Sequence, residues 1–226
     1  MSSLLIAQEV CAWIGKPSDV QVHGAAASIK HALGGETLVI VEGEPDTLSW
    51  IGQHRFIPKY FKGLGLLHSG FGTVGVALWE TLKAALPPTG LVTFTGYAGG
   101  AAIAQVVAAC CRLENPERMC RAVGFGSPRL VWMTNYKFNR LLRGANSFLY
   151  ARVGDPVTEV PVGPMYQHAL TPVKLGDGEE DDFIPTAHSM DRYCEDLSMV
   201  RELLKALAKG RRTSPDEIYG TKNAPG

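Results

Sequence analysis

The chain has 226 residues, of which 46% are hydrophobic and 19% charged, so it can bury a sizeable core and fits one α/β domain better than two. Lysine and arginine total 22 against 22 aspartate and glutamate residues, and this balance disfavours nucleic acid as a partner. The five cysteines have no zinc-like spacing, so we expect reduced structural thiols and no metal site.

The N-terminal segment gives an expectation about location. Residues 1–7 lack a basic start, and Glu9 interrupts the apolar run before it becomes long. This pattern predicts neither a signal peptide nor a membrane-spanning segment. We therefore expect a cytoplasmic protein without stable membrane insertion, with export by another route left open.

Hydrophobic periodicity divides the chain into helices and strands. Helices are expected at 3–14, 73–86, 101–109, 135–142 and 190–209, and strands at 36–41, 91–95, 122–125, 147–153 and 170–175. The last helix has apolar positions at helical spacing, namely Tyr193, Leu197, Val200, Leu203, Leu204 and Leu207. Residues 20–31 are ambiguous, with a short helix possible at 25–30. Residues 49–67 mix aromatic and basic side chains and predict either a lid over an apolar cleft or a loop packed on the core.

Strands that alternate with helices predict an α/β fold, with a mostly parallel central sheet and helices on both faces. We expect one domain over residues 1–210. Residues 211–226 are rich in polar residues, glycine and proline, and they predict a flexible tail.

The segment Gly96-Tyr97-Ala98-Gly99-Gly100 lies between a predicted strand and a predicted helix. In G-x-S-x-G this context forms a nucleophile elbow, in which glycines allow a sharp turn that projects the central side chain above the sheet. Here the central residue is Ala98, which has no nucleophilic atom. A plain glycine-rich turn is the alternative at this point.

Two later residues can complete a hydrolase site. Asp155 follows a predicted strand, and His188 precedes the last helix, so the order of nucleophile, acid and base is the one that hydrolases of this architecture use. His168 is a competing base, because it is closer to Asp155 in the sequence. We interpret His68 as a buried hydrogen-bonding residue near the floor of the pocket.

Five segments together resemble the class 3 lipase family, the branch of the α/β-hydrolases that includes fungal lipases, over residues 36–195. They are Val39-Ile40-Val41-Glu42-Gly43 with Trp50, His68-Ser69-Gly70-Phe71, Thr95 to Ala101, Gly124 to Arg129, and Gly154-Asp155-Pro156-Val157 leading to Val160-Pro161 and His168. The resemblance implies the nucleophile position at Ala98, the triad acid at Asp155 and the general base at His188.

The resemblance also implies an oxyanion hole and a substrate site. The backbone N–H groups of Gly99 and Glu44 would bind the oxyanion. Tyr97, at a position where histidine is common in the family, and His68 are expected in the substrate site. The family usually has Arg-Gly-Thr or Arg-Gly-Ser where this chain has Glu42-Gly43-Glu44, so a hydroxyl is missing and a carboxylate near the oxyanion would have to turn outward.

The expected function is therefore a serine ester hydrolase of the lipase or carboxylesterase type. It would act on a small-molecule or lipid ester through an acyl-enzyme and need no cofactor. Because the elbow glycines, the acid and the base remain, we interpret Ala98 as a serine-to-alanine replacement that silences an enzyme. The alternatives are a naturally non-catalytic binding protein with a lipase fold, and amide or thioester hydrolysis on the same triad. The oligomeric state stays open.

Overall fold

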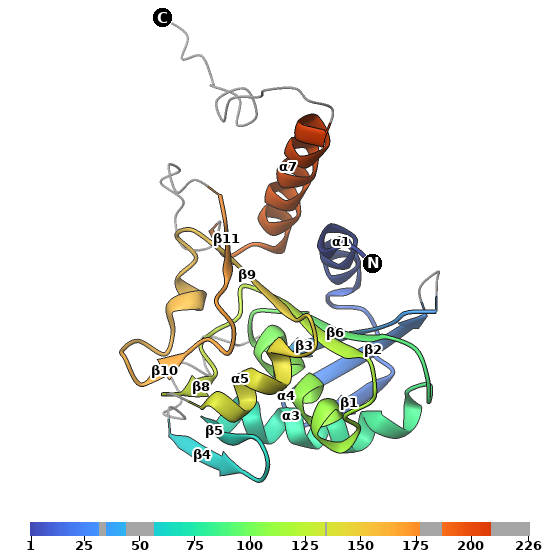
Figure 1. The fold of residues 1–226 in the computed structure, drawn as a ribbon, viewed down its shortest axis with the longest axis vertical. Coiled ribbons are helices and arrows are strands. Elements are labelled where there is room, and N and C mark those ends of the chain that lie inside the picture. Colours follow the sequence, from blue (N-terminus) through green and yellow to red (C-terminus); the bar gives the residue numbers. More distant parts are fainter. Residues whose placement is uncertain (32–34, 44–56, 134, 177–186, 209–226) are drawn as a thin grey trace, which may run out of the picture.

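A computed structural model describes residues 1–31, 35–43, 57–133, 135–176 and 187–208 (Figure 1). Its helices are α1 (Ser3–Trp13), α3 (Ser69–Leu82), α4 (Gly99–Glu114), α5 (Tyr136–Arg143) and α7 (Met190–Ala208), with 3-10 helices η1 (Lys83–Ala85) and η2 (Pro156–Glu159). Its strands are β1 (Val20–Val22), β2 (Ala25–His31), β3 (Thr37–Gly43), β4 (Pro58–Phe61), β5 (Gly65–His68), β6 (Val92–Tyr97), β7 (Cys120–Phe125), β8 (Val131–Trp132), β9 (Phe148–Arg152), β10 (Tyr166–Gln167) and β11 (Val173–Leu175). Glu44, residues 49–56 of the predicted lid and the predicted tail lie outside the described residues.

The central sheet has the strand order β1-β2-β3-β6-β7-β9-β11. Strands β3, β6, β7, β9 and β11 are parallel, whereas β1 and β2 run antiparallel at one edge. The predicted α/β fold with a mostly parallel sheet is therefore confirmed. Because the parallel strands end at the same edge, the residues that follow β6, β7 and β9 lie near one another.

Helices cover both faces of this sheet (Figure 1). Strand alternation sends Val39 and Val41 of β3 into the core beneath α3, α4 and α5, and sends Leu38 and Ile40 into a second core beneath α1 and α7. Residues 38–41 of β3 are buried on both faces, as expected for the continuous apolar run Leu-Val-Ile-Val.

Strand β2 corrects one expectation, since residues 25–30 form no helix. Although alanine favours helices, the whole strand pairs with β3, from Ala25 opposite Gly43 to His31 opposite Thr37. Ala25, Ala27 and Ile29 face the core at every second position. Tertiary pairing thus overrides the local helical propensity.

The described part of the predicted lid is a β-hairpin. Strands β4 and β5 pair antiparallel and belong to a second sheet of order β10-β8-β5-β4. Residues 57–67 therefore form ordered sheet structure, and whether residues 49–56 act as a lid stays a prediction.

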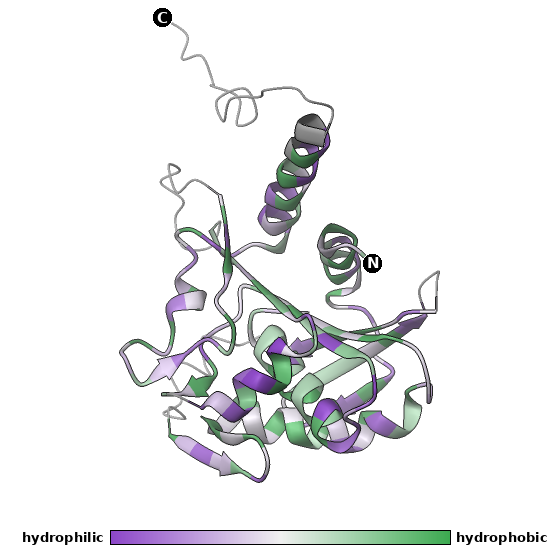
Figure 2. Ribbon diagram, in the orientation of Figure 1, coloured by the Kyte–Doolittle hydropathy of each residue, from purple (hydrophilic) through white to green (hydrophobic). Residues whose placement is uncertain are grey.

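Helix α3 packs closely against α4. Gly75 is buried there, and a side chain at this position would collide with Val106 of α4, whereas Ala77 on the other side of α3 is exposed. The predicted inner positions of α7 need correction. In α7 hydrophobic and hydrophilic residues alternate (Figure 2), and one face of its first turns is buried, through Met190, Tyr193 and Leu197. Val200 and Leu204 are nevertheless exposed, because this part of the helix extends beyond the sheet (Figure 1).

Candidate active site

A sharp turn joins β6 to α4 at Ala98. The backbone angles of Ala98 are φ 51° and ψ −125°, a conformation that costs a residue with a Cβ atom about 1–3 kcal/mol. Two hydrogen bonds fix the turn: the Ala98 amide donates to the Phe125 carbonyl over 2.9 Å, and the Ala101 amide donates to the Ala98 carbonyl over 3.0 Å. The sequence-predicted elbow therefore has the backbone geometry of a strained strand-to-helix turn.

The flanking glycines are needed because β3 lies directly against the first turn of α4. A Cβ atom at Gly100 would lie 2.2 Å from the Val41 carbonyl oxygen, and one at Gly96 would lie 2.6 Å from that same oxygen. Real Cβ atoms do not approach backbone oxygens so closely, and only glycine fits at these two positions.

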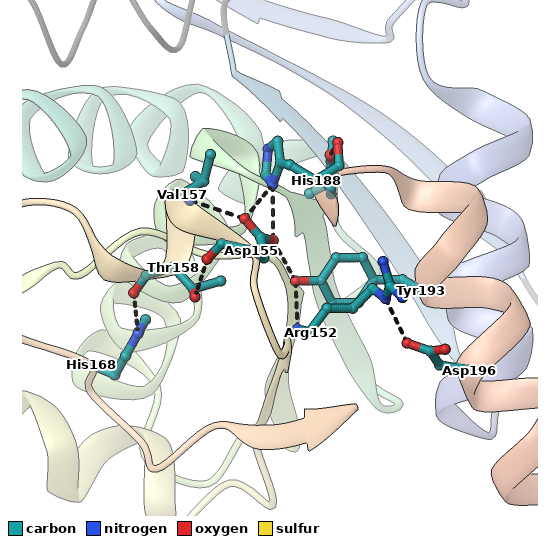
Figure 3. Close-up of polar contacts among 9 residues, drawn as sticks. Arg152, Asp155, Val157, Thr158, His168, His188, Tyr193 and Asp196 are labelled. Carbon is teal, nitrogen blue, oxygen red and sulfur yellow. Dashed lines mark hydrogen bonds and ion pairs between the residues drawn. The ribbon is translucent and has the colours of Figure 1, made fainter. Parts of the chain in front are cut away.

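Asp155 lies three residues beyond the end of β9 and is 2% exposed. Its Oδ1 accepts a hydrogen bond of 2.9 Å from the Val157 amide, and its Oδ2 accepts one of 2.6 Å from the Tyr193 hydroxyl (Figure 3). These bonds stabilise the charged carboxylate in a buried place and fix its orientation.

His188 lies against this carboxylate. Its Nδ1 is 3.0 Å from Oδ1 and 2.9 Å from Oδ2 of Asp155 (Figure 3). Because an ionised carboxylate can only accept, Nδ1 is the donor in this contact, and Nε2 is the ring nitrogen left to exchange a proton. The imidazole is thus held in the tautomer that a general base requires.

The elbow and the Asp155–His188 pair lie together. The Tyr97 hydroxyl donates to the His188 carbonyl over 2.7 Å, and the two rings stack with centroids 4.6 Å apart. A Cβ atom at Gly126, which follows the Phe125 that binds the Ala98 amide, would lie 3.2 Å from His188 Cε1 and 3.1 Å from Asp155 Oδ2. The three sequence-predicted residues therefore meet at the carboxyl edge of the sheet.

The hydroxyl of Tyr193 connects Asp155 to helix α7, a contact that was not predicted from the sequence. It accepts a 3.0 Å hydrogen bond from the Arg152 amide while it donates to Asp155, and Arg152 forms a buried 2.8 Å ion pair with Asp196 (Figure 3). Burial raises the pKa of Tyr193, which keeps the hydroxyl protonated. The sequence did contain one indication of this contact. Tyr193 is one of the apolar positions of the last predicted helix, and a buried tyrosine hydroxyl needs a hydrogen-bond partner.

The two other histidines considered from the sequence, His168 and His68, occupy different surroundings. The Nε2 atom of His168 donates to the Thr158 carbonyl over 2.9 Å, so this ring binds backbone rather than the carboxylate of Asp155 (Figure 3). His68 is 2% exposed and packs against Phe71 and Tyr166, and burial lowers its pKa to about 4. It is therefore neutral near pH 7, and its expected contact with substrate stays a prediction.

Part of the expected oxyanion hole is described. Gly99 is the first residue of α4, where amide groups have no acceptor within the helix. Gly43, at the end of β3, lies against this turn, since its Cβ would be 3.1 Å from the Gly100 nitrogen. The Glu42 carboxylate accepts a hydrogen bond of 3.0 Å from the Gly15 amide, just beyond the end of α1, so its negative charge is hydrogen-bonded there. Glu44 lies outside the described residues.

Among the described residues, no group of three or more His, Cys, Asp or Glu side chains is arranged to hold a metal ion. Within the same part of the chain, every helix is too short or too polar to cross a membrane.

The mostly parallel central sheet, the helices on both of its faces and the sharp turn after β6 are those of an α/β-hydrolase fold. The sequence model of the family described as lipase (class 3) matches residues 38–165, more than half of the chain. The chain therefore belongs to the class 3 lipase family, and the resemblance inferred from the motifs is confirmed.

Solved structures of lipases share the fold. Lip2 lipase from Yarrowia lipolytica matches at 15% identity with a TM-score of 0.54, over 68% of this chain and 66% of that one. The Rhizomucor miehei lipase propeptide complex matches at 16% and 0.57, over 77% and 66%. A triacylglycerol lipase whose catalytic centre is a serine protease triad matches at 16% and 0.58, over 70% and 64%. The chain thus spans about two thirds of the length of these lipases. No curated protein sequence matches it.

Proposed function

We propose that this chain is the silenced form of a serine ester hydrolase of the lipase or carboxylesterase type, with Ala98 at the nucleophile position. The observation that carries the proposal is the buried Asp155–His188 pair beside a strained turn whose central side chain is a methyl group. A turn that costs free energy and a base held in one tautomer serve no purpose in a passive loop.

In the serine form, Nε2 of His188 would accept the hydroxyl proton as the oxygen attacks the ester carbonyl. Asp155 would stabilise the resulting imidazolium, and the imidazolium would then protonate the leaving alcohol. The amide of Gly99 and that of Glu44 would bind the oxyanion, each contributing about 3 kcal/mol to the transition state. A water molecule, deprotonated by His188, would then attack the acyl-enzyme, and the carboxylic acid product would leave as the serine hydroxyl takes back its proton. No cofactor takes part in these steps.

The substrate class follows from the family and from the chemistry of an acyl-enzyme. A small-molecule or lipid ester supplies the carbonyl and an alcohol leaving group that one imidazole can protonate. The similarity to a triacylglycerol lipase favours a lipid ester among these. His68, whose ring is buried close to Phe71, would contribute to the floor of the acyl site.

Restoring the nucleophile tests the proposal. We expect Ala98→Ser to hydrolyse p-nitrophenyl esters, measured by nitrophenolate release over a series of acyl lengths. Asp155→Asn or His188→Ala in this background should each lower kcat about 10⁴-fold. His168→Gln is the matched control and should leave kcat within about twofold, because this ring binds a backbone carbonyl and not the acid. Equal loss with His168→Gln would contradict the assignment of the base.

The alanine itself favours a second candidate, a non-catalytic binding protein that uses the lipase fold for recognition. In that case Ala98→Ser would show no turnover on any ester of the series. Turnover of amide or thioester substrates by the same variant would instead assign the triad to a different leaving group.

A further inference from the structure

Tyr97 contacts His188 twice, and these contacts extend the proposed function on which this inference rests. Its hydroxyl donates to the His188 carbonyl over 2.7 Å, and its ring lies almost parallel to the imidazole, with centroids 4.6 Å apart and 22° between the planes. One side chain thus holds both the backbone and the ring of the candidate base.

The base needs such support because of where it lies in the chain. His188 precedes α7, which begins at Met190, so the regular hydrogen bonds of that helix do not fix its backbone. Asp155 holds only the Nδ1 edge of the ring. A hydrogen bond at one edge leaves the plane of the ring free to tilt about that bond, whereas a stacked face restricts the tilt.

Tyr97 is also tied to the nucleophile position. It directly precedes Ala98, and its backbone pairs with Phe125, whose carbonyl binds the Ala98 amide. The same rigid strand end therefore sets the position of the β-carbon at 98 and of the aromatic ring that contacts the base.

We propose that Tyr97 is a positioning residue that orients His188 toward residue 98. This differs from the sequence expectation that Tyr97 binds substrate, because the hydroxyl already donates to His188. Burial raises the pKa of this hydroxyl, and the nearby Asp155 carboxylate adds to the shift, so it remains a donor throughout the neutral range.

The first experiment uses the chain as it is, with Ala98. NMR can follow the Nδ1 proton of His188, which resonates far downfield when a carboxylate accepts it. We expect Tyr97→Phe, which keeps the ring, to speed exchange of this proton with water about fivefold, the effect of one hydrogen bond. Tyr97→Leu, which removes ring and hydroxyl, should abolish the signal.

Tyr150→Phe is the matched control. Tyr150 is also partly buried, its hydroxyl donates to Ser3 over 2.7 Å, and its ring stacks on Phe125 with centroids 5.5 Å apart. It should lose similar thermal stability to Tyr97→Phe but leave the His188 proton unchanged. An unchanged His188 signal in both Tyr97 variants would overturn the proposal.

The second experiment uses the Ala98→Ser background. A displaced base slows proton transfer without weakening ester binding, so kcat should fall about fivefold for Tyr97→Phe and about 100-fold for Tyr97→Leu, with KM unchanged. A higher KM at constant kcat would instead assign Tyr97 to substrate binding and overturn the proposal. If Ala98→Ser proves inactive while Tyr97→Leu abolishes the NMR signal, ester hydrolysis is contradicted and the positioning of His188 is supported.

Discussion

At the scale of single residues, the backbone conformation of Ala98 is that of a nucleophile elbow, although its methyl side chain has no nucleophilic atom. The glycines around it allowed the turn to be predicted from the sequence, because few other patterns place a compact residue between a strand and a helix. Asp155 and His188 were also predictable, from their order and their places next to a strand and a helix. Tyr193 and the ring contact of Tyr97 were not, because they depend on which side chains face each other across the finished sheet edge.

The conformation of Ala98 predicts an unusual stability effect. A residue with a Cβ atom at φ 51° and ψ −125° has a strained backbone that costs about 1–3 kcal/mol in the folded state. Glycine avoids this strain but loses more backbone entropy on folding, which costs about 0.5–1 kcal/mol relative to alanine. We therefore expect Ala98→Gly to raise the free energy of unfolding by about 1 kcal/mol, measured by urea denaturation. Ala77→Gly on the exposed side of α3 is the control and should lower it by about 1 kcal/mol. Destabilisation by Ala98→Gly would mean that the turn is not strained.

At the scale of elements, long segments were predicted better than short ones. The helices α3, α4 and α7 have enough turns to show their periodicity, and β3 shows a continuous apolar run. The two-residue strands β8 and β10 carry no readable pattern, since they exist only through pairing with neighbours that are distant in the sequence. The hairpin of β4 and β5 is local in the sequence, but it was missed because its mixture of aromatic, basic and apolar residues shows no regular alternation.

The contact between β3 and α4 gives the prediction at this scale. In Gly100→Ala the new Cβ would lie 2.2 Å from the Val41 carbonyl, so the helix must move away from the strand. We expect the free energy of unfolding to fall by about 3 kcal/mol in urea titrations. Gly144→Ala is the control: its backbone is helical, and its Cβ would meet the Arg140 carbonyl at an ordinary 3.5 Å. An equal loss in both variants would contradict the close approach of β3 to α4.

At the scale of the whole molecule, the candidate site results from the topology. Position 98 follows β6, Asp155 follows β9, and His188 precedes α7, so the site forms only when the parallel strands are in register. The sequence could predict which residues lie at strand ends, because glycine and proline mark those ends. It could not predict the strand order, which places β7 and its Gly126 between the elbow and Asp155.

The buried imidazole of His68 predicts how the stability of the folded chain depends on pH. Its pKa falls from 6.5 to about 4 on folding because burial penalises the charged form. Well above pH 6.5 it is neutral in both the folded and the unfolded chain and contributes no pH dependence. Below pH 6.5 the imidazole binds a proton in the unfolded chain but stays neutral in the folded chain. The free energy of unfolding therefore decreases as the pH falls to about 4, by about 3 kcal/mol in total.

We expect His68→Gln to remove this loss, so that unfolding free energies measured in urea at pH 7 and pH 4.5 differ less than in the parent chain. Burial also lowers the pKa of His168, which leaves part of the acid sensitivity in the variant. His23→Gln, at an exposed histidine, is the matched control and should keep the full dependence. If His68→Gln and His23→Gln lose stability equally on acidification, the imidazole of His68 accepts a proton in the folded state and is not held neutral by the core.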